Sequence, residues 1–146
     1  MGEKVYIGID PDRDKSGVAV WRNKQLMLGN ASFFELFDMF QKAIVEAAVS
    51  DIEIKVIVEA GWLNPQSNRH VHHKGTRVAS KIGANVGANH ETGKKIVEMC
   101  EYLGLKHELK MPTSKKLNAE QFKILTKYPG TTNSEKRDAG MLVFGL

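Results

Sequence analysis

The sequence has little that would tie the chain together covalently or hold it in a membrane. Cys100 is the only cysteine in 146 residues, so an internal disulfide is impossible. It lies among apolar residues at helical spacing, which predicts a buried core thiol rather than a nucleophile. There is no apolar run of membrane-spanning length and no signal-peptide pattern, so we expect a cytoplasmic protein that makes no membrane contact.

The composition is that of an ordinary globular domain. Hydrophobic residues make up 42% of the chain and charged residues 26%, and the sequence contains no internal repeat, linker or low-complexity tract. A chain of 146 residues is long enough to bury a core of its own, so we expect one domain over residues 1–146. The net charge of +4 is compatible with a polyanionic partner but does not require one.

Hydrophobic periodicity predicts an α/β fold with a mixed five-stranded sheet flanked by helices. The first three strands are expected to form an antiparallel meander, whereas the helix that follows implies a crossover to a parallel strand. Strands are predicted over 4–10, 16–21, 25–30, 54–60 and 105–111. Helices are predicted over 32–49, 76–102, with an interruption near its glycines left open, 117–128, and from Asn133 or Ser134 onward.

Acidic residues end two of these strands. Asp10 closes the first strand and Glu59 closes the parallel one, so the crossover brings both carboxylates to the same edge of the sheet. Asp138 lies in the last helix, and Glu135 precedes it by three residues on the same helical face. Clustered carboxylates need protons or cations, and hard oxygen ligands favour Mg²⁺ or Mn²⁺. The spacing alone also allows Glu59 and Asp138 to be ordinary surface acids.

The repeated aspartates of DPDRDKSG suggest a calcium loop, with Asp10, Asp12 and Asp14 at its first, third and fifth ligand positions. The pattern fails further along, because the sixth position is Lys15 rather than glycine and the twelfth is Trp21 rather than an acid. We therefore expect Asp12 and Asp14 to be solvated turn residues, and Asp10 alone to belong to a site.

Positive charge is concentrated between residues 64 and 95. This segment contains six basic residues and one acid, Glu91, so its net charge is +5. It follows Glu59 closely in the sequence, which would place positive charge beside the acids, where a phosphate backbone would lie. HVHH lacks cysteine and a second cluster at zinc spacing, so phosphate or base contacts suit its histidines better than zinc. The predicted nucleic-acid contacts are Arg69, His72, His73, Lys74, Arg77, Lys81, Lys94 and Lys95.

Two further features of this region have two interpretations each. The small residues of GANVGAN, at spacings of four, allow close approach either by another helix or by a nucleic acid. Trp62 is expected to pack beside the acids, with stacking on a base as the alternative.

Several segments carry a resemblance to a known family. IGIDPDRDKSGVAVW resembles the first motif of the RuvC-type Holliday junction resolvases of the ribonuclease H-like superfamily, VIVEAGW is similar to their second acidic motif, and NSEKRDAG is similar to their last. ASKIGANVGANHETGKKIVEMCEYLGL resembles their glycine-containing helix, and MPTSKKLN resembles the segment before their closing helices. The segments follow one another in the family's order over nearly the whole chain. One departure is Asp12, where the family usually has glycine.

The resemblance implies a ribonuclease H-like fold and divalent-metal-dependent hydrolysis of phosphodiester bonds in branched DNA. It makes Asp10, Glu59 and Asp138 catalytic metal ligands, with Glu135 at the fourth acidic position. Two Mg²⁺ or Mn²⁺ ions and a homodimer that cuts symmetric strands are further expectations. A ribonuclease on the same fold and a nucleic-acid-binding module without catalysis stay open. A sugar-kinase-like ATPase is disfavoured, because no second glycine-rich phosphate loop is present.

Overall fold

The computed structural model describes residues 2–65 and 76–146, and the side chains of 76–80 lie outside that description. The sheet contains β1 (Glu3–Asp10), β2 (Ser16–Arg22), β3 (Gln25–Ala31), β4 (Ile52–Glu59) and β5 (Lys106–Lys110). The helices are α1 (Phe33–Val49), the short 3₁₀ helix η1 (Gly61–Leu63), α2 (Thr76–Leu103), α3 (Ala119–Thr126) and α4 (Ser134–Val143). The strands and the α-helices follow the order that the sequence predicted, whereas η1 was not predicted.

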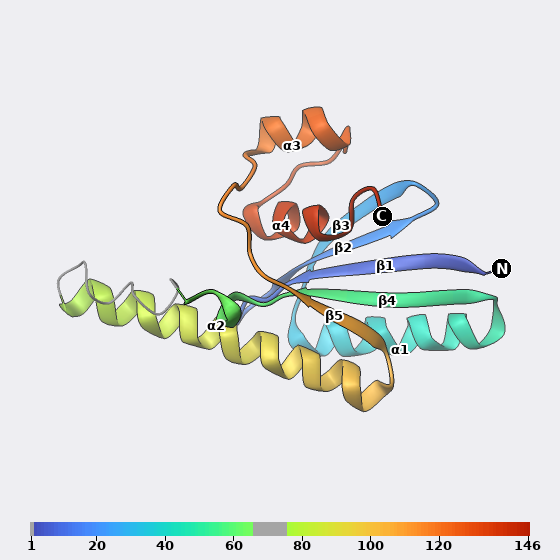
Figure 1. Ribbon diagram of the computed structural model, residues 1–146, viewed down its shortest axis with the longest axis horizontal. Coiled ribbons are helices and arrows are strands. Elements are labelled where there is room, and N and C mark those ends of the chain that lie inside the picture. Colours follow the sequence, from blue (N-terminus) through green and yellow to red (C-terminus); the bar gives the residue numbers. More distant parts are fainter. Residues whose placement is uncertain (1, 66–75) are drawn as a thin grey trace.

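The five strands form one mixed sheet in the order β3-β2-β1-β4-β5. β1 pairs antiparallel with β2 and parallel with β4, while β5 extends the parallel half. Helices α1 and α2 cover one face of this sheet and α4 covers the other, with α3 beyond it (Figure 1). This arrangement confirms the predicted fold class, an α/β fold with a mixed five-stranded sheet flanked by helices.

The central strand β1 is buried on both faces, as its near-continuous apolar sequence predicted. Ile7 and Ile9 point into the larger core, which also contains Leu36 and Phe40 of α1. On the opposite face a smaller cluster joins the sheet to α4 through Ala139 and its neighbours. Because successive side chains of a strand alternate between faces, the residues of β1 that do not point into the larger core lie on the face that α4 covers.

The helix boundaries follow from local capping. Ser32 caps α1 in a capping box with Glu35, as predicted. Helix α3 is shorter than the expected 117–128, because Asn118 caps its start and Lys127 adopts a left-handed conformation that ends it. Helix α2 is continuous through its glycines.

Cys100 is fully buried in the larger core, and burial raises the pKa of its thiol to about 11. The predicted core role of this cysteine is confirmed. None of the helices in residues 2–65 and 76–146 combines the length and apolar character needed to cross a lipid bilayer.

Candidate metal centre

The first two acids of the site are neighbours at the carboxyl ends of parallel strands. The register pairs Ile9 of β1 with Val58 of β4, so Asp10 and Glu59 follow side by side. Ile9 and Val58 point into the core beneath α1 and α2. By strand alternation, the carboxylates of Asp10 and Glu59 therefore project toward the opposite face, where α4 lies.

Asp138 reaches the same point from α4. Asn133 caps this helix through a hydrogen bond from the backbone N–H of Lys136, and Ala139 and Leu142 hold the helix against the sheet. Candidate ligand atoms of Asp10, Glu59 and Asp138 all lie within 4.8 Å of one another. Three carboxylates from three elements are thus close enough together to hold a cation.

Two glycines allow α4 to lie so close to the sheet. A methyl group on Gly8 of β1 would lie 2.5 Å from the carbonyl oxygen of Ala139. A methyl group on Gly17, which pairs with Asp10 across β1 and β2, would lie only 2.0 Å from the carbonyl oxygen of Glu135. The absence of these side chains lets the helix backbone rest directly on the strands, which brings Asp138 within reach of the two strand-end acids.

Lys116 provides the positive charge of this cluster. It lies on the irregular segment between β5 and α3, and its Nζ is 2.9 Å from Oε1 of Glu59 and 3.4 Å from Oδ2 of Asp138. The side chains of the two acids are 11% and 19% exposed, whereas that of Lys116 is 43% exposed. The ammonium therefore bridges two largely buried acids from the solvent side.

The surroundings make ionisation of the acids costly. Burial raises the pKa of Asp10 from 3.8 to about 8, and the charges of Glu59 and Asp138 act in the same direction. Burial also raises the pKa of Glu59, against the opposing effect of its ion pair with Lys116. For Lys116, burial favours the neutral amine, but the hydrogen bond to Glu59 and the nearby acids outweigh it and raise the pKa. A single ammonium thus leaves Asp10 protonated near neutral pH.

The contribution of Asp10 to the free energy of unfolding, measured in chelator, is expected to fall as the pH rises from 3.8 to about 8. In this interval the folded state keeps the proton of Asp10 that the unfolded state has released, so a rising pH favours unfolding. Each unit of pKa difference corresponds to about 1.4 kcal/mol, which makes a fall on the order of a few kcal/mol. Denaturant titrations of wild type and Asp10→Asn at several pH values isolate this contribution. If the free energy of unfolding changed with pH in the same way in both proteins, this contribution of Asp10 would be contradicted.

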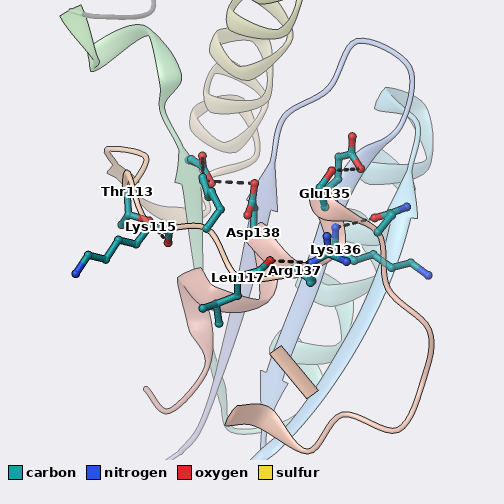
Figure 2. Close-up of polar contacts among 11 residues, drawn as sticks. Thr113, Lys115, Leu117, Glu135, Lys136, Arg137 and Asp138 are labelled. Carbon is teal, nitrogen blue, oxygen red and sulfur yellow. Dashed lines mark hydrogen bonds and ion pairs between the residues drawn. The ribbon is translucent and has the colours of Figure 1, made fainter. Parts of the chain in front are cut away.

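Glu135 is placed differently from the other three predicted acids. It lies one helical turn before Asp138, but it does not belong to the group of mutually close ligand atoms among the described residues. Its Oε2 accepts a hydrogen bond from Oγ of Ser134 at 3.1 Å. Figure 2 shows its side chain apart from that of Asp138, which lies nearer to the segment with Thr113 and Lys115. Its charge still contributes to the raised pKa of Asp10.

A cavity of about 190 Å³ adjoins the acids on the side of α2, and Asp10 and Glu59 form part of its wall. Trp62 lines it and packs against Gly93, where a methyl group would lie 2.4 Å from the indole ring. The edge of this ring meets His90, and burial lowers the pKa of that histidine. Trp62 therefore packs beside the acids, as expected.

The turn after β1 is fixed by its own polar groups. Oδ2 of Asp12 accepts hydrogen bonds from the backbone N–H groups of Asp14 and Lys15, at 3.0 and 3.3 Å. The backbone N–H of Arg13 donates to Oδ1 of Asn89 on α2 at 2.9 Å. Asp12 and Asp14 are turn residues, as predicted, and the loop is tied to α2 beside the cavity.

The predicted nucleic-acid contacts are only partly described. Arg69, His72, His73 and Lys74 lie outside the described residues, as does the side chain of Arg77. Lys81, Lys94 and Lys95 are exposed on α2. Lys94 pairs with Glu91 at 3.7 Å and Lys95 pairs with Glu98 at 3.0 Å, so acids of the same helix partly neutralise both.

The glycines of α2 differ in their surroundings. A methyl group on Gly87 would meet no atom of the described residues within 4 Å, so none of the described elements packs closely against the helix there. Gly93, in contrast, is covered by Trp62.

Sequence reasoning missed Lys116 and Asn89. Lys116 is 57 residues from Glu59 and Asn89 is 76 residues from Arg13, so no local spacing connects either pair. The segment MPTSKKLN was recognised only for its proline and its place before the closing helices. The sequence contains one signal that could have indicated a lysine at this site: a cluster of acids needs positive charge nearby.

No protein-family model matches this sequence, and no curated protein matches it. Among solved structures, the chain is similar to the RuvC of T. thermophilus in complex with a Holliday junction substrate. The identity is 16% and the TM-score is 0.44, over 93% of this chain and 87% of that one. A likeness of this degree establishes neither a family nor a function.

Proposed function

We propose that the chain is a divalent-metal-dependent endonuclease that hydrolyses phosphodiester bonds in branched DNA. The observation that carries the proposal is the convergence of Asp10, Glu59 and Asp138, whose candidate ligand atoms lie within 4.8 Å of one another in a largely buried setting. Buried acids held this close carry full charge together only when more positive charge is present than one lysine supplies; otherwise one of them keeps a proton. Oxygen ligands of this kind suit Mg²⁺ or Mn²⁺.

The three acids fit such a cation in number and in donor chemistry. Bound divalent cations supply activation of water and stabilisation of charge on phosphate oxygens. In this proposal, Asp10 and Glu59 present carboxylates from rigid strand ends and Asp138 completes the set from α4. Glu135, one turn earlier, is proposed as an outer acid of the same centre. Residues 1–146 are proposed to act as one such catalytic domain.

The proposed path of the nucleic acid runs along α2. The cavity beside Asp10 and Glu59 leaves space next to the acids, and Lys81 and Lys94 are exposed on the same helix. Positive charge along this helix favours a phosphate backbone over a neutral substrate. The choice of branched DNA, and of a homodimer with two sites, rests on the motif resemblance in the sequence.

Cleavage is tested with a four-way DNA junction, linear duplex DNA and duplex RNA, each with Mg²⁺, with Mn²⁺ or with chelator. We expect metal-dependent nicking of the junction in preference to the linear duplex. Asp138→Asn controls for contaminating nuclease and should lower the rate about 10²-fold or more, since it removes a proposed ligand. Preferential cutting of RNA would favour the ribonuclease alternative, and no cleavage of any substrate would contradict the proposal.

A specific observation favours a second candidate, a nucleic-acid-binding module without catalysis. Lys116 already neutralises part of the acidic cluster. If the ammonium occupies the site permanently, the basic residues of α2 still bind nucleic acid. Salt-dependent DNA binding without divalent-cation binding would identify this module.

A further inference from the structure

Lys116 occupies the place where a cation is needed. We propose that it is the resident counter-ion of the centre and competes with the divalent cation for Glu59 and Asp138. Binding of the divalent cation then displaces the ammonium. This inference rests on the proposed function, because it concerns the same acids.

The competition follows from the contacts of the ammonium. Its Nζ lies 2.9 Å from Oε1 of Glu59 and 3.4 Å from Oδ2 of Asp138, and both acids belong to the cluster of three. A divalent cation on these oxygens would lie within a few ångströms of Nζ. Two positive charges at such a distance in a partly buried setting repel strongly, so the two cations exclude each other.

The ammonium is also able to leave. Its side chain is 43% exposed and stands on a flexible four-carbon stem, so a change of rotamer moves the charge into solvent. The backbone beside it is held, because Nε of Arg137 donates to the carbonyl oxygen of Leu117 at 3.0 Å (Figure 2). Nη1 of Arg137 also donates to Oγ1 of Thr132 at 3.0 Å. Displacement therefore needs movement of one side chain rather than of the segment.

The ammonium of Lys116 has opposite effects on the metal-free and the metal-bound protein. Without metal, the ammonium offsets the repulsion among buried acids and stabilises the fold. With metal present, breaking its two ion pairs is a cost that lowers the apparent affinity for the divalent cation. Removing the charge of Lys116 should therefore weaken the metal-free fold and strengthen metal binding.

The test compares Lys116→Met with Lys115→Met in the full chain. Lys115 carries the same charge on the same segment, but no ion pair joins it to Glu59 or Asp138 in the described part of the chain. Mn²⁺ binding is measured by calorimetry and metal-free stability by thermal unfolding. We expect about tenfold tighter Mn²⁺ binding and a lower unfolding temperature for Lys116→Met. Lys115→Met should match wild type in both.

The outcomes separate this inference from the proposed function. If wild type binds Mn²⁺ and Lys116→Met binds it equally or more weakly, the inference is overturned and the endonuclease proposal stands. If only Lys116→Met binds Mn²⁺, the inference stands and metal-dependent activity of the wild type is overturned. If neither protein binds Mn²⁺, both are overturned.

A measurement on wild type covers the case in which Lys116→Met does not fold. Amine labelling with mass-spectrometric readout reports how accessible each lysine is. We expect Mg²⁺ to increase the labelling of Lys116 and to leave that of Lys115 unchanged. Equal labelling of Lys116 with and without Mg²⁺, under conditions where the cation binds, would overturn the displacement.

Discussion

Asp10→Asn is expected to abolish metal-dependent cleavage and, at the same time, to make the metal-free protein more stable at neutral pH. The amide keeps the shape of the side chain but cannot release a proton, so it can never present the negative charge that a bound cation needs. Burial and the neighbouring acids raise the pKa of Asp10 to about 8, so the charged form is costly when no cation is bound. The charge that the proposed activity requires is thus one that the fold by itself disfavours.

The size of the effect follows from the ligand count. In Asp10→Asn, only Glu59 and Asp138 of the close group of three can still offer a charged oxygen to a cation, and Lys116 pairs with both. We expect Mn²⁺ affinity to fall about 10²-fold and cleavage to fall below detection. Junction cleavage, calorimetry with Mn²⁺ and denaturant unfolding in chelator give the three readouts.

Asp12→Asn is the matched control for Asp10→Asn. It removes the same charge two residues away, and an amide oxygen can still accept the turn hydrogen bonds that Asp12 receives from Asp14 and Lys15. Cleavage and Mn²⁺ affinity should stay within about twofold of wild type, as for a partly exposed charge outside the centre. Cleavage that survives Asp10→Asn but is lost in Asp12→Asn would show that the wrong aspartate was assigned.

Gly17→Ala is expected to disable the centre without touching any acid. The new methyl group would lie 2.0 Å from the carbonyl oxygen of Glu135, a distance that no relaxation of a side chain can relieve. The first turn of α4 must move away from β2, and Asp138 moves with it. Overpacking of this kind costs about 1–3 kcal/mol. A displacement of about 1 Å at a reacting centre can cost roughly 10²-fold in rate.

Gly29→Ala controls for a general effect of replacing a strand glycine. Gly29 lies on β3, and a methyl group there would meet no atom within 4 Å in the part of the chain that the structure describes. Unfolding should show lower stability for Gly17→Ala and little change for Gly29→Ala. Mn²⁺ affinity, measured well below the unfolding temperature, should fall for Gly17→Ala alone. Wild-type affinity in a folded Gly17→Ala protein would contradict the positioning of Asp138 by this close approach.

Much of the fold was predictable because local interactions determine it. Alternating and continuous apolar runs defined the strands, and Ser32 marked where α1 begins. Asn133 and Ser134 were both candidates for the cap of α4, and the structure uses Asn133. The adjacency of Asp10 and Glu59 was also predictable, since a strand, a helix and a second strand imply a parallel pair whose ends meet. The end of α3 was harder to predict, because it depends on the left-handed backbone conformation of Lys127.

Contacts between residues close along the chain, together with a fixed crossover, were enough to predict the strand order of the meander, the starts of α1 and α4 and the two strand-end acids from the sequence. Tertiary structure alone decided the rest of the centre. The approach of α4 over Gly17 brings Asp138 to the strand ends and leaves Glu135 outside the close group. The ion pairs of Lys116 join segments far apart in sequence, so only packing of the whole chain could reveal that the acids already share a cation.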